Sequence, residues 1–434
     1  MSFHSFRDGN FDKKNMNMYN KLWLWHDKHP LPYKMNICIR KIILYFRAYK
    51  MILKRKFFIE RKLKHKKVDE FGDPIVPDRR IVNQKYQFSK IKKEKIIEWF
   101  EKIHNINEFL RNKDGSWNPQ PYANYSGKGI SIEEVALRII GYYSAFKATN
   151  NTVYLNKARE GVRYLLEKRF FADGHLLLQG HTVIDTTYTF AGLALLKAYE
   201  MEKDEKFLKF AEKLGEHLIS YQIAGSTNHA AIPAQLLAKL YFYTGQKKFL
   251  KYALKRIKWA VLPFQLPYGG WYAKHESWSW YHSIIAQSIL ETYIYTPFTL
   301  EFIKIKDNMA IALYKAINRL ILAQREDGSI KAGRGALSYD EKDEYGSCPS
   351  NQWVYFDEKK KSFTLLPPQN KHEFYSFELY FLCNAWYRLP LPQLGNTIYG
   401  LSNYYMNMNR FWRLEFDTLA VGMLLEAIYE IGEI

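Results

Sequence analysis

Three segments of the chain share one spacing of aromatic and small residues, and this repeat limits the fold more than any other feature. They are residues 145–158, 198–211 and 240–253. In each, an aromatic residue is followed eight positions later by a second aromatic, then by Leu, and three positions further by Ala. The matched residues are Phe146, Tyr154, Leu155 and Ala158; Tyr199, Phe207, Leu208 and Ala211; and Tyr241, Phe249, Leu250 and Ala253. Such a unit predicts an array of helical hairpins.

Two kinds of turn separate the predicted helices. A short polar turn, TNN, EKDE or TGQK, lies between the two aromatics of each unit. A glycine turn follows the second helix: KDGSW, ADGHLLL, YGGWYAK and EDGSIKAG. Glycine supplies the positive φ that lets a short extended piece double back. From about residue 90 this order predicts roughly six hairpins, in a solenoid that is open or closed into a ring.

The hairpin frame and the glycine turns resemble the (α/α) toroid, in which inner and outer helices alternate around a central cavity. The resemblance covers about residues 90–434. One similar group is glycan-active: N-acylglucosamine 2-epimerases, unsaturated glucuronyl hydrolases, toroidal polysaccharide lyases and the helical domain of glucuronyl C5-epimerases. The resemblance implies an all-α fold, an (α/α) toroid of about six helical hairpins at residues 91–434. The composition of residues 1–90 indicates a basic N-terminal helical extension, which ends in an extended connector near residues 70–90 that contains two prolines and a glycine.

A second group of toroids, the terpene cyclases and protein prenyltransferases, carries a repeat of Gln, Gly and Trp. Gln265, Gly269 and Trp271 match it in full, and Gln324 and Gly328 match it in part. The acidic D-x-D-D motif that starts terpene cyclisation is not found in the sequence, nor is a prenyltransferase zinc set. Lanthionine cyclases share the toroid, but their zinc ligands are not found either. An isoprenoid cyclase or prenyltransferase therefore stays a second alternative.

The positive charge of the chain is concentrated outside the repeats. The formal net charge is +20, of which residues 1–100 carry +15. Residues 34–67 alone hold nine Lys and four Arg against one Glu. Basic residues recur every seven positions from Arg40 to Arg61, and apolar residues such as Ile42 and Tyr49 fall on the other side. We expect an amphipathic helix that packs on the toroid or lies on an anionic membrane surface.

The remaining sequence signals concern location and cofactors. The first residues lack the apolar run of a signal peptide, and no apolar stretch is long enough for a membrane span. Cys38, Cys348 and Cys383 show no metal-site spacing. We expect a cytoplasmic protein, peripheral to the membrane if the extension binds lipid, with no metal, no cofactor and no nucleic-acid partner, because the chain contains no recognisable nucleic-acid-binding motif.

The glycine loops and the starts of the inner helices hold the candidate site residues, because these segments line the cavity in similar toroids. Ser131 and Glu134 predict a capping box, and Asp185 could cap a helix or act in catalysis. Residues 268–293 are the most unusual stretch, with Trp, His, Glu and Tyr close together. The candidate catalytic residues are Asp185, Glu276, Tyr281, His282 and His181, and the candidate substrate-binding residues are Trp117, Tyr188, His229, Trp271, Trp278, Arg334 and Glu373.

This inventory favours sugar chemistry. Indoles stack on the apolar faces of sugar rings, and neighbouring polar groups hold hydroxyls or carry protons. Hydrolysis of a glycoside needs two facing carboxyl groups, whereas elimination or epimerisation of a uronate needs a neutralised carboxylate and proton-carrying Tyr or His. The sequence predicts an epimerase, lyase or glycoside hydrolase that acts on a poly- or oligosaccharide containing uronate. A non-catalytic glycan-binding or membrane-associated scaffold is the alternative.

Overall fold

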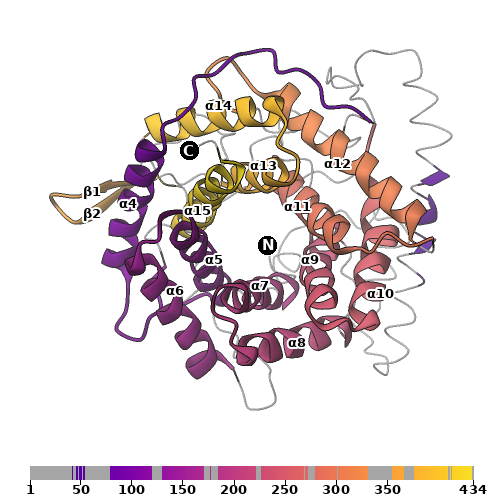
Figure 1. Ribbon diagram of the computed structural model, residues 1–434, viewed down its shortest axis with the longest axis horizontal. Coiled ribbons are helices and arrows are strands. Elements are labelled where there is room, and N and C mark those ends of the chain that lie inside the picture. Colours follow the sequence, from indigo (N-terminus) through magenta and orange to yellow (C-terminus); the bar gives the residue numbers. More distant parts are fainter. Residues whose placement is uncertain are drawn as a thin grey trace, which may run out of the picture.

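The computed structural model describes residues 42, 45, 46, 48–50, 52, 53, 79–119, 130–170, 176, 184–220, 226–267, 269–271, 279–300, 302–330, 354–365, 376–408, 411 and 413–432. In these ranges the α-helices α4 to α15 alternate between an outer and an inner ring around a central axis (Figure 1). The chain is therefore an (α/α) toroid of six hairpins in its described part, as the sequence predicts.

The two rings follow the order of the chain. The outer helices are α4 (Lys93–Leu110), α6 (Thr152–Tyr164), α8 (Glu205–Ser220), α10 (Lys247–Arg256), α12 (Ile303–Ala323) and α14 (Pro392–Met408). The inner helices are α5 (Ile132–Thr149), α7 (Ile184–Glu202), α9 (Thr227–Thr244), α11 (Ser279–Tyr295), α13 (Ser376–Arg388) and α15 (Leu414–Ile431). A short antiparallel hairpin, β1 (Val354–Asp357) and β2 (Ser362–Leu365), lies between α12 and α13 in the chain.

Residue patterns explain which helices lie inside. In the outer helix α8 the buried residues, including Leu208, Ala211 and Leu218, form one stripe, so the helix is amphipathic. In the inner helix α15 every residue from Leu414 to Ile428 is buried. A helix that is covered on all sides must be apolar around most of its circumference, and inner helices satisfy this condition.

The repeat frame is confirmed as a repeated turn geometry. The sixth residue of each frame is Asn150, Lys203 or Gly245, and these have φ of 55°, 59° and 66°. Each donates its N–H to the carbonyl of the first aromatic of its frame, at 2.7, 2.9 and 2.8 Å. A left-handed residue at this point ends the inner helix and reverses the chain. The Ala that closes each frame is fully buried.

The glycine turns also repeat, and each packs on the next outer helix. Gly115, Gly269 and Gly328 have φ of 88°, 89° and 90°. A Cβ on any of them would lie 2.1 to 2.6 Å from a backbone carbonyl oxygen of α6, α12 or α14. Only glycine fits, because both the angle and the space exclude a side chain.

Two glutamines fasten these turns to the neighbouring repeat. The Gln265 side chain donates to the carbonyl of Ala312 in α12, at 2.8 Å. The Gln324 side chain donates to the carbonyl of Thr397 in α14, at 2.9 Å. Each also donates to the glycine of its own turn. The repeat shared with terpene cyclases thus serves packing between hairpins in this chain, and it gives no support to isoprenoid chemistry.

The ring closes where the first and last inner helices meet. α15 packs against α5, and the two backbones approach at Gly141 and Gly422. A Cβ on Gly141 would lie 2.3 Å from the carbonyl oxygen of Thr418. We refer to this contact of Gly141, Thr418 and Gly422 as the closure contact.

The described part of the connector, residues 79–91, runs over the outside of the ring. Its backbone is hydrogen-bonded to Asn318 of α12 and to Asn396 and Asn403 of α14. These residues form no helix or strand, and they are tied to the toroid by these contacts. Among the described helices, none is both long and apolar enough to cross a membrane.

Candidate functional site

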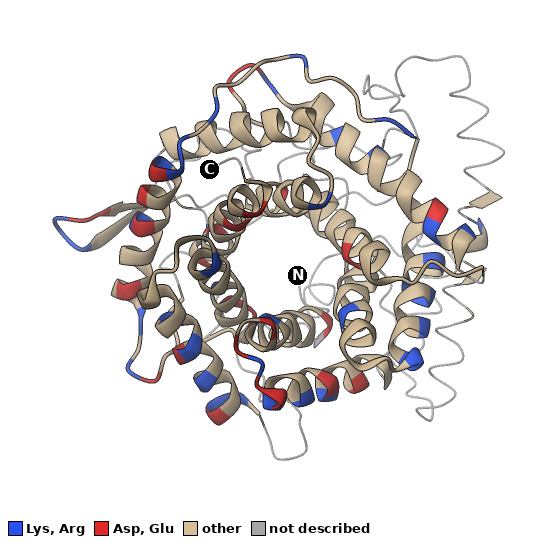
Figure 2. Cartoon of the chain, in the orientation of Figure 1, with Lys and Arg blue, Asp and Glu red and all other residues tan. Residues whose placement is uncertain are grey.

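The inner helices begin at one end of the ring and finish at the other, so their first turns gather at one mouth. We call the end formed by the first turns of α5, α7, α9, α11, α13 and α15 the N-terminal mouth. Figure 2 shows that the inner helices are mostly uncharged, with isolated charged residues among them. The glycine loops join the ring at the same end, so we expect the site residues at this mouth.

A cluster of charged groups joins the first turns of α5 and α15. Arg413 pairs through Nε with Glu415 and through Nη2 with Oε1 of Glu134, 3.3 Å away. Nη2 of Arg138 lies 3.6 Å from the other Glu415 oxygen. The predicted capping box is wrong, because Ser131 makes no side-chain hydrogen bond to α5 and Glu134 pairs with Arg413 instead.

Two carboxyl groups at this cluster, those of Glu134 and Glu133, bind protons more tightly than usual. Burial and the nearby Glu415 raise the pKa of Glu134, although Arg413 and Arg138 act in the opposite direction. Burial also raises the pKa of Glu133, which is hydrogen-bonded to Thr186 of α7. Three carboxyl groups face two guanidinium groups here, so the cluster can keep a proton at a pH at which an ordinary carboxyl group is ionised.

Asp185 is the predicted catalytic residue whose position best suits chemistry. It lies in the first turn of α7, is 4% exposed, and burial raises its pKa to about 6, an effect that Arg256 only partly offsets. Within the described structure its Oδ1 atom accepts no hydrogen bond. A carboxyl with a free oxygen and a pKa near neutrality has the properties of a general acid or base.

Aromatic rings from three inner helices form the apolar part of the mouth. The Trp280 ring lies 5.7 Å from that of Phe377 and 5.8 Å from that of Phe416. The Arg413 guanidinium lies over Phe416, 4.4 Å from the ring centroid. Trp280 is half-buried. The sequence marks this residue only as part of an unusual stretch, and it cannot show that three helices bring these rings together.

Tyr281, Tyr188 and His229 occupy the starts of α11, α7 and α9. Tyr281 is half-buried and contacts Trp280, with 4.5 Å between ring centroids. Tyr188 is buried, and its hydroxyl accepts a hydrogen bond from the backbone of Leu176 at 3.4 Å. His229 is half-buried in the first turn of α9. These three residues are placed at the mouth, and their roles stay predictions.

His282 faces away from the mouth. It is buried, and its Nε2 donates to the carbonyl of Ala316 in the outer helix α12, at 3.0 Å. Burial lowers its pKa to about 4, so the ring is neutral. This contact between an inner and an outer helix favours a packing role, and we no longer place His282 among the catalytic residues.

Trp117 and Trp271 are also assigned to packing. Both indoles are fully buried and so offer no surface to a sugar. Each lies six residues after Arg111 or Gln265 and forms an isolated β-bridge with it across a glycine turn. Trp117 is stacked on Tyr142, with ring centroids 6.0 Å apart. The expectation of substrate binding is corrected by this burial.

The remaining predicted site residues lie outside the described residues. They are His181, Glu276, Trp278, Arg334 and Glu373. Among the described residues, no group of three or more His, Cys, Asp and Glu side chains is arranged to hold a metal ion.

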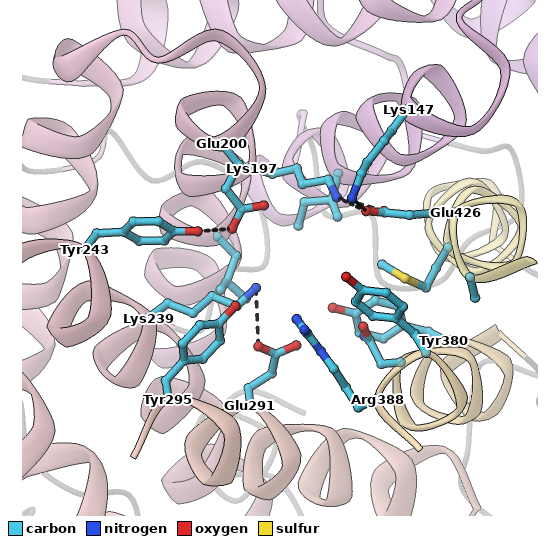
Figure 3. A pocket seen from close by; sticks show the side chains of 16 residues that line it. Lys147, Lys197, Glu200, Lys239, Tyr243, Glu291, Tyr295, Tyr380, Arg388 and Glu426 are labelled. Atoms are coloured by element: carbon cyan, nitrogen blue, oxygen red, sulfur yellow. Dashed lines mark hydrogen bonds and ion pairs between the residues drawn. The ribbon is translucent and has the colours of Figure 1, made fainter. Parts of the chain in front are cut away.

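The opposite end of the ring contains a charged cavity of about 210 Å³, shown in Figure 3. Side chains from the last turns of the inner helices line it, and they alternate in charge. Lys147 and Lys197 pair with Glu426 at 3.0 and 2.7 Å. Lys239 pairs with Glu291 at 3.3 Å.

Two carboxylates of this cavity, those of Glu426 and Glu200, have lowered pKa values and are ionised. Burial would raise the pKa of Glu426, but Lys197 and Lys147 outweigh it and hold the pKa at about 2. The pKa of Glu200 is lowered in spite of burial, by Lys239 and Lys197 and by the hydrogen bond from Tyr243. The negative ends of the inner-helix dipoles point to this end, where the lysines complement them. Such pairing suits a structural role, whereas the N-terminal mouth holds carboxyl groups with raised pKa values.

Comparisons with known proteins support the fold. No protein-family model matches the sequence, and no curated protein does. Among solved structures, the unsaturated glucuronyl hydrolase from Streptococcus agalactiae is similar with a TM-score of 0.53 and 13% identity, covering 81% of this chain and 97% of that chain. A glycosyl hydrolase of family 88 from Bacteroides vulgatus gives a TM-score of 0.53 and 9% identity, with 78% and 100% covered.

A third similar structure belongs to another glycoside hydrolase family. The family 76 α-mannanase from Bacteroides thetaiotaomicron gives a TM-score of 0.51 and 11% identity, covering 78% of this chain and 96% of that chain. At such low identity the likeness concerns the fold. This chain therefore shares the (α/α) toroid of glycan-active enzymes over most of its length, as the sequence resemblance implies.

Proposed function

We propose that this protein is a carbohydrate-active enzyme that binds a poly- or oligosaccharide containing uronate at the N-terminal mouth. One observation carries the proposal: the buried Asp185 carboxyl, with a pKa of about 6 and an unpartnered oxygen, lies at the mouth of a toroid. Hydrolysis, elimination and epimerisation of a sugar all need a group that delivers or removes a proton. Asp185 is the described residue best suited to this step.

The surroundings of Asp185 supply the other needs of a sugar site. The half-buried Trp280 indole can stack on a sugar ring, since the face of a pyranose is apolar. The cluster of Glu134, Glu415 and Arg413 borders the mouth from α5 and α15 and can accept hydrogen bonds from sugar hydroxyls. Arg413 is engaged by both carboxylates, so we regard it as a positioning residue.

The similar structures support this substrate class by their own ligands. The unsaturated glucuronyl hydrolase from S. agalactiae was solved in complex with dGlcA-GalNAc6S, at a TM-score of 0.51 and 14% identity to this chain. Its name and ligand concern an unsaturated uronate sugar. The α-mannanase with the same fold acts on a neutral glycan, which is the reason to test both kinds of substrate.

The proposal is tested by turnover. The purified protein is incubated with a panel of saturated and unsaturated uronate oligosaccharides and with neutral mannans, and products are followed by NMR and by release of reducing ends. We expect turnover of a uronate substrate that is lost in Asp185→Asn and kept in the matched variant Asp114→Asn, which lies on an exposed glycine turn.

Two outcomes would contradict the proposal. Full activity of Asp185→Asn would remove this residue from the chemistry. Binding of a glycan by the native protein without any turnover would favour a non-catalytic scaffold, the alternative that the sequence leaves open.

A further inference from the structure

The basic extension contacts the toroid at one outer helix. Tyr45 lies edge-on to Trp259, with ring centroids 4.8 Å apart and an angle of 87° between the rings. Trp259 belongs to η5 (Ile257–Val261), the segment that continues α10. Ala48, one turn after Tyr45, is fully buried, and Lys255 lies over the Tyr45 ring at 5.9 Å. One side of this helix is therefore packed against the end of α10.

Next to this packed side, the same helix carries a second group of apolar residues that are exposed. Ile42, Phe46, Tyr49 and Ile52 are 52%, 58%, 60% and 41% exposed. They follow one another at spacings of four, three and three residues, so they form a single stripe. Packing on the toroid uses Tyr45 and Ala48 and leaves this stripe uncovered. A row of large apolar side chains on a surface marks a site of interaction.

The toroid adds its own positive charge beside this stripe. Residues 247–261, which form α10 and η5, hold five Lys and one Arg and no Asp or Glu. Lys247, Lys251 and Lys258 are exposed, and Figure 2 shows the basic residues along α10. At helical spacing these lysines form a row that ends at Trp259, where the extension packs. The extension itself carries the strongest basic run of the sequence, residues 34–67.

We propose that the exposed stripe of Ile42, Phe46, Tyr49 and Ile52, together with the lysine row of α10, is a docking face for an anionic lipid bilayer. Apolar side chains enter the boundary between headgroups and acyl chains, while lysines contact the anionic headgroups around them. A nucleic acid would match the charge but not the four apolar side chains. Lipid binding at this face is a different function from the proposed sugar chemistry, and the face includes α10 of the toroid itself.

Vesicle flotation tests the face directly. The full chain is mixed with phosphatidylcholine vesicles that contain or lack phosphatidylserine. We expect flotation only with phosphatidylserine, and weaker flotation at high salt. The triple variant Lys247→Glu, Lys251→Glu and Lys258→Glu should bind roughly 100-fold more weakly, since each lysine near an anionic surface contributes about one factor of five to ten.

Two further variants separate charge, insertion and folding. The double variant Phe46→Ser and Tyr49→Ser should also lose flotation, with its circular dichroism and thermal unfolding unchanged, because both side chains are exposed. The matched control reverses Lys92, Lys95 and Lys102, exposed lysines at the start of and along α4 on the opposite side of the ring (Figure 1), and should float like the native protein.

Specific results would overturn the inference. Equal flotation of the α10 variant and the α4 control would show that the toroid does not take part. Binding of single-stranded RNA, without flotation on anionic vesicles, would assign the face to nucleic acid instead. Because flotation is measured without any glycan, its failure would leave the proposed enzyme activity untouched, and loss of turnover would leave this face untouched.

Discussion

Gly141 of α5 and Gly422 of α15 lie against each other where the ring closes. A Cβ built on Gly422 would lie 2.3 Å from the carbonyl oxygen of Gly141. Neither helix could approach so closely with a side chain in this place. The closure contact therefore rests on the absence of side chains at two positions that are about 280 residues apart in the chain.

The first prediction concerns this closure contact. Gly422→Val should lower the free energy of unfolding by about 3 kcal/mol, because a side chain forces the two backbones apart. Chemical denaturation measures the effect. Gly245→Asn serves as control: its Cβ would meet nothing within 4 Å, and Asn150 already occupies the equivalent left-handed position. A control variant as unstable as Gly422→Val would contradict the explanation.

The second prediction concerns the hydrogen bonds that the Gln324 side chain makes between neighbouring hairpins. Gln324→Leu removes the donor to the carbonyls of Gly328 and Thr397 and leaves both acceptors buried. We expect a loss of about 1–3 kcal/mol in unfolding free energy. Gln393→Leu, on the same outer helix as Thr397, removes only an exposed hydrogen bond to Asn83 and should change it by less than about 0.5 kcal/mol. Equal stability of the two variants would show that the Gln324 hydrogen bonds contribute nothing to the free energy of unfolding.

The third prediction concerns the pH dependence contributed by Asp185. Its folded pKa of about 6 lies above its ordinary value of 3.8. The folded state therefore binds the proton more tightly, and stability falls as pH rises from about 4 through about 6. Asp185→Asn should be more stable than the native protein by up to about 3 kcal/mol above that range, and the difference should vanish below it. Unfolding curves measured across the pH range test this prediction. A difference in unfolding free energy that does not change with pH would contradict it.

The fourth prediction has the opposite sign. Glu426 has a folded pKa of about 2, below its ordinary value of 4.5. Its contribution is complete above about pH 4.5 and is lost as pH falls through about 2. Glu426→Gln should cost about 3 kcal/mol at neutral pH and progressively less in acid. Glu430→Gln, which affects only the more exposed pair with Lys147, should cost less than about 1 kcal/mol at neutral pH. A larger loss in Glu430→Gln would contradict the assignment.

The fifth prediction separates the two kinds of tryptophan. Trp280→Leu should raise KM for the glycan substrate about two- to tenfold, because a stacking contact of about 0.5–1.5 kcal/mol is lost. Trp271→Leu should lower the melting temperature instead and leave KM of the folded enzyme unchanged, since its indole is fully buried. Steady-state kinetics and calorimetry on both variants decide the matter, and a KM effect in Trp271→Leu would return that residue to the binding site.

The ring of hairpins could be predicted from the sequence because its signals are local. The frame of aromatic, Leu and Ala repeats at fixed spacing, and the turn residues Asn150, Lys203 and Gly245 recur at one position of it. Glycine turns need a particular φ, so their residue type is visible without a structure. The closure of the ring is not local, because Gly141 and Gly422 acquire meaning only when the two helices meet.

The candidate site could be predicted only in part. Asp185 is visible because it precedes an apolar helix after a polar loop. The cluster of Glu134, Arg413 and Glu415 is not, since its members come from opposite ends of the repeat region. Trp117 and Trp271 show the reverse error: tryptophan beside a glycine turn has the same pattern whether the indole meets a sugar or fills the core, and burial alone separates the two cases.

The hydrogen bonds by which Gln265 and Gln324 tie two glycine turns to the next outer helix have a consequence for how such a ring can change in evolution. At least two hairpins are not complete by themselves, because their turns need a carbonyl from the neighbouring hairpin. Removing or adding one hairpin would alter the circumference and separate Gly141 from Gly422. The diameter of the ring is thus set by a whole number of hairpins. Additional residues can be accommodated only in the loops at the rim of the ring, where the proposed chemistry is located.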